Sequence, residues 1–226
     1  MVTGPGNIYV AAAKRALRGL IGIDSEAGPT EILIIADSQA NPASVAADLI
    51  SQAEHDENAA AVLVTDSQNL IAAVQKELDQ QVSITPNAER VKLALGGMQS
   101  ALVLVPDLET AVAVSNEYAT EHLEIQTQRP QELLSKITNA GAIFLGEYSP
   151  VSLGDYLAGS NHVLPTGEQA KFGPGLGVHT FLRAQQVINY SRPALREVAD
   201  QLDTFAIAEG LSAHGDAAKI RFTGGN

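Results

Sequence analysis

The chain has 226 residues, of which 45% are hydrophobic and 18% are charged, a composition typical of a globular protein. Its formal net charge of −12 disfavours nucleic acid and anionic membranes as partners, because both require a basic surface. It has no cysteine, which excludes disulfides and thiolate metal sites and predicts a cytoplasmic protein. No apolar run approaches the roughly 18 residues of a membrane span.

The chain opens with MVTGPGNIYVAAAKRALRGL, which predicts a glycine-rich turn leading directly into a helix. Natural domains rarely open on a turn, so we expect that a preceding segment belongs to the fold. Residues 31–37, EILIIAD, predict a short buried strand. Residues 41–55 predict a helix with Asn41 as N-cap and Pro42 at the first helical position.

The same alternation of strand and helix continues to Gly146. Further strands are expected at residues 60–65, 101–105, 122–127 and 142–146, and further helices at residues 66–81, 84–97, 107–119 and 129–141. Either Asp66 or Ser67 is expected to cap the first of these helices. Strands that alternate with helices indicate an α/β fold, with a parallel or mixed sheet covered on both faces.

After Gly146 the pattern changes. Residues 147–177 are rich in glycine, serine and proline and predict a long loop, which in a compact domain is usually functional or disordered. Three helices are predicted beyond it, at residues 178–191, 192–210 and 212–221, and they would form a small C-terminal helical arm.

The histidines are the first candidates for chemistry. Four of the five stand beside other polar side chains: His55, His122, His162 and His214. Gln52 and His55 are three residues apart, so on a helix they project from one face, with an amide and an imidazole that can both ligate a metal ion. A histidine near a solvated helix C-terminus is also an ordinary structural feature, and each histidine taken singly has a structural interpretation.

Glu121 and His122 fall where a helix gives way to a strand. Ligands of open α/β sheets gather outside the carboxyl ends of the strands, so we expect this pair there, together with Asp155 and His162 of the long loop. The chain has no HExxH motif, so a zinc site would be assembled from distant segments.

Nucleotide-binding motifs are weak. No G-x-G-x-x-G follows a strand, and the glycine-rich stretches at residues 4–7 and 173–177 are individually unspecific. The second stretch is equally consistent with a loop that leads into a helix.

Residues 23–55, IDSEAGPTEILIIADSQANPASVAADLISQAEH, resemble the signature segment of the histidinol dehydrogenase family. In that pattern, I-D-x-x-A-G-P-[S/T]-E leads into a strand, and a helix of fixed length ends on E-H. Further blocks match in the order of the family, at residues 4–15, 116–125, 141–166 and 208–214. The resemblance therefore covers essentially the whole chain.

The resemblance implies the oxidation of L-histidinol to L-histidine through the aldehyde, with two NAD molecules and one zinc ion per subunit. It implies zinc ligation by Gln52, His55, Asp155 and His214. It also implies an acid–base pair of Glu121 and His122. Substrate contacts are implied for Thr30, His162 and Glu209, in addition to His122 and the zinc ligands. Asn7 is the one position that matches an NAD contact.

The resemblance further implies an intertwined homodimer in which the arm carries His214 to the partner's site. It divides the chain into a remnant of a second nucleotide-fold domain (residues 1–26), an incomplete Rossmann-like α/β domain (27–176) and a helical dimerisation arm (177–226). Family members are about twice as long, so we expect an incomplete sheet and no activity from this chain alone. Two alternatives stay open: a related zinc- and NAD-dependent alcohol dehydrogenase for another substrate, and a non-catalytic zinc-binding or dimerisation module.

Overall fold

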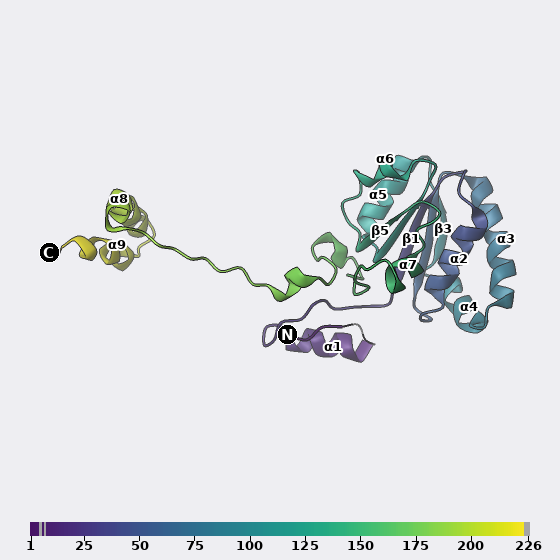
Figure 1. Ribbon diagram of the computed structural model, residues 1–226, viewed down its shortest axis with the longest axis horizontal. Helices are drawn as coiled ribbons and strands as arrows, with labels where there is room; N and C mark the ends of the chain where they lie inside the picture. The colour runs from purple at the N-terminus through teal and green to yellow at the C-terminus, as the bar shows by residue number, and fades with distance from the viewer. Residues whose placement is uncertain (5, 7, 224–226) are drawn as a thin grey trace. The chain divides into compact units, whose positions relative to one another are not determined.

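The structure is a computed structural model that describes residues 1–4, 6 and 8–223. The chain divides into two compact units, Met1–Leu182 and Arg183–Asn226, and each is described here by itself. The first unit is built around a five-stranded sheet (Figure 1).

All strands of this sheet are parallel, in the order β3-β2-β1-β4-β5. The strands are β1 (Glu31–Ala36), β2 (Ala60–Thr65), β3 (Ala101–Leu104), β4 (His122–Gln126) and β5 (Ala142–Leu145). The three central strands are buried almost throughout, as expected of apolar strands covered on both faces. The prediction of an α/β sheet covered by helices is confirmed.

Helices pack on both faces of the sheet (Figure 1). One face is covered by α2 (Pro42–Ala53), α3 (Gln68–Ile84) and α4 (Ala88–Gly96), and the other by α5 (Leu108–Tyr118) and α6 (Pro130–Leu134). The strand residues alternate between the two cores: Ile32 and Ile34 join the first, and Leu33 and Ile35 join the second. Complete burial of each such side chain contributes about 1.5–3 kcal/mol to folding.

The predicted helix starts follow from side-chain caps. The Asn41 side chain accepts a hydrogen bond from the Ala43 amide at 3.0 Å, and Pro42 stands at the first helical position of α2. Ser67, and not Asp66, caps α3, since its hydroxyl accepts from the Leu70 amide. These bonds satisfy amide groups that have no partner within the helix.

The prediction of a plain loop over residues 147–177 is wrong, because this segment contains α7 (Val151–Tyr156). The helix is too short for hydrophobic periodicity to show it. It is held by tertiary packing instead: Val151 is buried in the first core, and Gly154 lies so close to the Phe144 ring that an added Cβ would be 2.6 Å from it.

The helix predicted at residues 178–191 is also wrong. Only a 3-10 turn forms there, η2 (Val178–Phe181), and residues 182–191 adopt neither helix nor strand. Every side chain from residue 181 to 190 is exposed, and a helix of this length needs an apolar face packed on a neighbour to be stable. A second 3-10 turn, η1 (Gln169–Lys171), precedes this region.

The second unit is a helical pair, α8 (Arg192–Ala208) and α9 (Ser212–Lys219), followed by the 3-10 turn η3 (Ile220–Phe222). Small buried residues let the two helices approach closely: Ala199, Ala206, Gly215 and Ala218. The predictions of helices at residues 192–210 and 212–221 are confirmed. None of the described helices of the chain is long and apolar enough to cross a membrane.

The segment that precedes β1 contains α1 (Ile8–Leu17) and a buried ion pair. The Lys14 ammonium is 2.6 Å from Asp24 Oδ1, and the Gly4 amide donates to Asp24 Oδ2 at 2.7 Å. Burial opposes the charge on Asp24, but the bond from Lys14 and the amide bonds outweigh it and lower the pKa of this carboxyl. The ion pair thereby ties α1 to the chain that leads into the sheet.

Candidate active site

The candidate residues of the first unit gather at the amino edge of the sheet, where the strands begin. Glu121 directly precedes β4, His122 is its first residue, and Thr30 directly precedes β1. Gln52 lies in the last turn of α2, which ends at this edge. The expectation that Glu121 and His122 lie outside the carboxyl ends is therefore wrong, because in a fully parallel sheet every helix-to-strand junction lies at the amino edge.

A chain of hydrogen bonds joins α2 to the residues before β1 and β4. The Gln52 amide nitrogen donates to the Thr30 hydroxyl, which donates in turn to Glu121 Oε2 at 2.6 Å. The Glu31 amide donates to the same carboxyl oxygen at 3.0 Å. The other end of the Gln52 amide, Oε1, is buried without a hydrogen-bond partner. This arrangement orients the amide and leaves its oxygen free to bind another group.

The environment of His122 defines its tautomer. Its Nδ1 lies 3.1 Å from the Glu31 carbonyl oxygen, which can only accept, so Nδ1 carries the proton and Nε2 has the free lone pair. Nε2 is buried without a hydrogen-bond partner, 3.9 Å from Asp155 Oδ1. Burial lowers the pKa of His122, although the charge of Asp155 opposes this shift. The neutral ring is thus ready to accept a proton at Nε2.

The pKa of Glu121 is shifted in the opposite direction. Burial raises the pKa of this carboxyl to about 7, against the hydrogen bonds from Thr30 and Glu31, which lower it. Its Oε2 lies 3.5 Å from His122 Nδ1. A carboxyl that titrates near neutrality can both give and take a proton. Two adjacent residues therefore present a carboxyl and an imidazole that are both able to exchange a proton at the amino edge.

Asp155 and His55 complete the group around His122. Asp155 is half-buried in α7, and its carboxylate faces His122. His55 follows α2, close enough for its charge to lower the pKa of His122. The His55 Nδ1 lies 3.0 Å from the Ser51 carbonyl, so the ring caps the end of α2, as the structural interpretation predicts.

His162 is exposed. The segment after it returns to the amino edge, where the Thr166 hydroxyl accepts a hydrogen bond from the Gly28 amide at 2.5 Å. The expectation that Asp155 and His162 lie at the carboxyl end is therefore also wrong, because α7 and this segment both run back toward the start of β1 and β4.

The remaining candidate residues are not placed beside this group. Glu209 is the C-cap of α8 and His214 lies in α9, so both belong to the second unit, and both are exposed there. Asn7, matched to an NAD contact, lies outside the described residues.

The metal-binding prediction rests on few groups within the first unit. Across the described residues, no three or more His, Asp or Glu side chains are grouped to hold a metal ion. Three of the expected ligands lie in this unit: Gln52, His55 and Asp155. Gln52 is not a His, Asp or Glu, so only the other two belong to the residue types of such a group. The buried, unpartnered Gln52 Oε1 nevertheless fits a ligand, and the oxygen and imidazole donors fit zinc.

A second buried polar group was not foreseen. It consists of Asp48, Glu124 and Gln126 and is called the carboxyl cluster below. The Gln126 amide donates to Asp48 Oδ2 at 2.9 Å and to Glu124 Oε2 at 2.7 Å. Burial, reinforced by the charge of Asp48, raises the pKa of Glu124 to about 8. The sequence HLEIQ does carry a signal, since strand alternation puts His122, Glu124 and Gln126 on one face of a buried strand.

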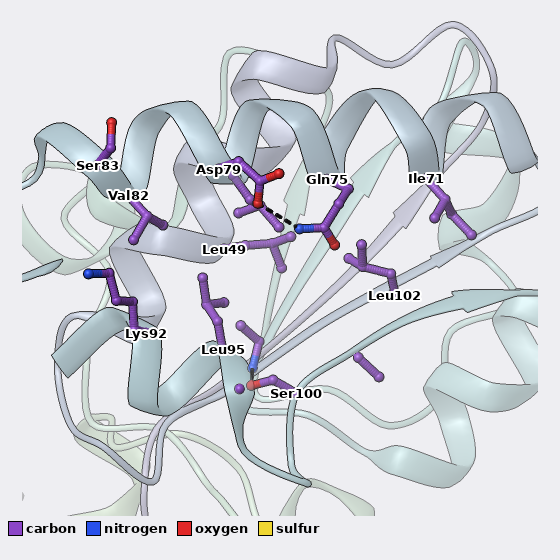
Figure 2. A pocket seen from close by; sticks show the side chains of 14 residues that line it. Leu49, Ile71, Gln75, Asp79, Val82, Ser83, Lys92, Leu95, Ser100 and Leu102 are labelled. Carbon is purple, nitrogen blue, oxygen red and sulfur yellow. Dashed lines mark hydrogen bonds between the residues drawn. The ribbon is translucent and has the colours of Figure 1, made fainter. Parts of the chain in front are cut away.

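A cavity lies elsewhere in the unit. It measures about 830 Å³ and is bounded by α3, α4 and β3. Figure 2 shows Leu49, Leu95 and Leu102 directed into the space beneath α3, on which Gln75 donates a hydrogen bond to Asp79 at 3.0 Å. None of the described candidate residues lines this cavity, so the acid–base pair is a separate feature.

The parallel sheet and the buried carboxyl–imidazole pair define the class: an α/β protein with a site suited to proton transfer. The comparisons agree on a particular family. The family model described as histidinol dehydrogenase matches residues 1–222. A histidinol dehydrogenase from Leifsonia xyli subsp. xyli is 63% identical over 222 residues, and one from Corynebacterium diphtheriae is 59% identical. The chain therefore belongs to the histidinol dehydrogenase family.

The match covers only part of each relative. It spans 98% of this chain in both cases, but 51% of the Leifsonia protein and 49% of the Corynebacterium protein. The crystal structure of histidinol dehydrogenase from Elizabethkingia anophelis matches with a TM-score of 0.91 and 36% identity, covering 97% of this chain and 50% of that one. The chain thus spans about half the length of the relatives it matches.

Proposed function

We propose that this chain supplies the proton-transfer residues of a histidinol dehydrogenase, an oxidoreductase that converts L-histidinol to L-histidine through the aldehyde. The observation that carries this proposal is the unpartnered Nε2 of His122, in a neutral ring held by the Glu31 carbonyl and next to a carboxyl of pKa about 7. Membership in the family supplies the reaction and the substrate.

Each residue of the pair suits one of the two proton transfers in the reaction. Oxidation of an alcohol needs a base for the hydroxyl proton while the hydride leaves from carbon to the oxidised nicotinamide. His122 Nε2 has the free lone pair to take this proton. Oxidation of the aldehyde needs an activated water molecule, and the carboxylate form of Glu121 can accept its proton.

A zinc ion would be held by Gln52, His55 and Asp155, with His214 as the fourth ligand. Zinc, when bound, polarises the substrate oxygen and favours its deprotonated form. The Thr30 hydroxyl keeps the Gln52 amide turned so that its oxygen is free, and it also orients Glu121. One side chain therefore couples the expected metal ligand to the expected acid–base pair.

The second unit suits an interaction with another copy of the chain. Phe205 is 72% exposed and Ile207 is 62% exposed, and both stand in the last two turns of α8. Exposed large apolar side chains on a helix favour burial against a partner. We propose that α8 and α9 form the dimerisation arm, with Glu209 placed to meet the ammonium group of the substrate.

The test is reconstitution of activity. The purified chain is mixed with a separately expressed amino-terminal half of the Leifsonia relative, and NADH formation is measured with L-histidinol and with other alcohols. We expect turnover only in the mixture and only with L-histidinol, and we expect His122→Gln to lower the rate by about 10²–10⁴-fold. An unchanged rate for His122→Gln would refute the role of the imidazole. Zinc binding without turnover would favour the non-catalytic module.

A further inference from the structure

α7 depends on the rest of the unit for its position. It has six residues, far fewer than a helix needs for stability in water by itself. It nevertheless carries Asp155, which must face His122 for both to act on one ligand. Whatever fixes the start of this helix therefore fixes the geometry of the candidate site.

The first amide of α7 is bound by a residue of the sheet. Glu124 Oε1 accepts a hydrogen bond from the Val151 amide at 3.0 Å, and the Glu124 side chain is only 1% exposed. Glu124 stands two positions after His122 on the same face of β4. One buried side chain thus links the strand that begins with His122 to the helix that carries Asp155.

The carboxyl cluster reaches the third element of the site as well. Asp48 lies in α2 one turn before Gln52, and it shares a hydrogen bond with Glu124. Two buried carboxyls in contact hold a proton between them, since both cannot ionise in a site of low polarity. The raised pKa of Glu124 assigns that proton to Glu124 at neutral pH. The neutral acid donates to Asp48 while it accepts from Val151.

We propose that Glu124 is a positioning residue which, through the carboxyl cluster, holds α7 at the distance that lets Asp155 face His122. This inference rests on the proposed function, because that proposal assigns Asp155 to the zinc ion and His122 to the substrate hydroxyl whose oxygen the zinc would polarise. Glu124 touches neither metal nor substrate in this role.

Three variants separate the role of the hydrogen bond from that of general stability. Glu124→Gln keeps an oxygen for the Val151 amide and an N–H group for Asp48, so it replaces the protonated acid at these two contacts and loses only the bond that Oε2 accepts from the Gln126 amide. Glu124→Leu removes both. Val151→Pro leaves Glu124 in place and deletes the amide N–H group, at a helix position that proline tolerates and after a residue, Pro150, that is already extended. It also replaces the buried Val151 side chain, so Val151→Ala, which keeps the amide, is measured beside it.

Two measurements report on α7 in the full chain. The first is hydrogen exchange of the Leu157 amide without metal, because this amide donates to the Leu153 carbonyl at 2.9 Å and closes the helix. The second is the affinity for zinc alone. Val74→Ala is the matched control, since Val74 is fully buried in α3 and belongs to the same core as Val151.

We expect faster exchange at Leu157 and about tenfold weaker zinc binding in Glu124→Leu and Val151→Pro. Glu124→Gln and Val74→Ala should match the unmodified chain in both measurements. Wild-type exchange and affinity in Val151→Pro would overturn the inference, as would equal losses in Val74→Ala. If the unmodified chain binds no zinc, the proposed metal site fails, whereas the exchange of Leu157 still decides the role of Glu124.

Discussion

Burial moves Glu121 and His122 toward their neutral forms. The same removal from water raises the pKa of the carboxyl to about 7 and lowers the pKa of the imidazole. The two side chains therefore do not form a simple ion pair, although Glu121 Oε2 and His122 Nδ1 are only 3.5 Å apart. Instead, a base with a free lone pair stands beside an acid that titrates near neutrality.

This pair predicts a pH profile for the reconstituted enzyme. The carboxylate of Glu121 forms as the pH rises through about 7, so a step that needs this base should accelerate through the same range. The pKa of His122 is lowered, so its base form is already present there. We expect Glu121→Gln to lower the rate of aldehyde oxidation by about 10²–10⁴-fold and to abolish this rise.

The measurement is the rate of NADH formation from the aldehyde between pH 5 and pH 9. It is made on the enzyme reconstituted with the unmodified chain and on the enzyme reconstituted with Glu121→Gln. Thr110→Val serves as a control, because Thr110 bonds to Asp107 at the exposed start of α5, away from the pair. A Glu121→Gln enzyme whose rate still rises through neutrality would show that another group titrates.

At the scale of single residues, the sequence identifies residue types but not their contacts. Gln52 and His55 were expected on one helix face, and Glu121 beside His122, because these pairs are close in the chain. The link through Thr30 spans 91 residues to Glu121 and has no local pattern. The prediction of the sheet edge is wrong because the general rule for open sheets concerns the ends of strands, whereas Glu121 and His122 stand at a junction that begins one.

Among the elements, the junction that leads into β4 is unusually tight. Ala119 caps α5 with a φ of 52°, in the left-handed region that costs a non-glycine residue about 1–2 kcal/mol. Gly141, directly before the neighbouring strand β5, lies so close to the backbone that an added Cβ would be 2.5 Å from the Glu121 carbonyl oxygen. The backbone that presents Glu121 is therefore confined from both sides.

We expect Gly141→Ala to separate the starts of β4 and β5, because a backbone carbonyl cannot move aside as a flexible side chain can. The loss should be roughly 1–3 kcal/mol of unfolding free energy. Gly96→Ala is the control, since nothing lies within 4 Å of its added Cβ. Urea unfolding at constant slope measures both variants, and equal midpoints would contradict the close approach.

Most of the elements could be predicted, and the exceptions have physical causes. Local periodicity predicts the strands β1 to β5, and cap residues predict the starts of the capped helices. α7 does not, because a six-residue helix held by Glu124 from 27 positions away has no period of its own. Residues 178–191 show the reverse case, in which helical periodicity exists but every side chain from residue 181 to 190 is exposed.

For the molecule as a whole, the division into two units separates the expected zinc ligands. Gln52, His55 and Asp155 belong to the unit Met1–Leu182, whereas His214 belongs to Arg183–Asn226. The proposed four-ligand site therefore depends on His214, from this chain or from a second copy, as its last ligand. The sequence predicted this split only through the family resemblance, since no local motif joins these positions.

We expect His214→Asn to lower the zinc content of the purified chain strongly, because three ligands retain the ion less well than four. His179→Asn should leave the zinc content unchanged, since His179 is exposed and outside the ligand set. Metal analysis of both variants, together with their oligomeric mass, provides the test. Equal zinc in His214→Asn and the unmodified chain would mean that α9 supplies no ligand.

The position of the site at the amino edge also determines the electric field that a ligand meets. α2 and α5 both end there, and the free carbonyl groups of a last helical turn amount to about half a negative charge. Such an edge attracts zinc and the ammonium group of an amino alcohol, and it repels phosphate. We therefore expect a dinucleotide to present its nicotinamide to this edge while other parts of the whole enzyme hold its pyrophosphate.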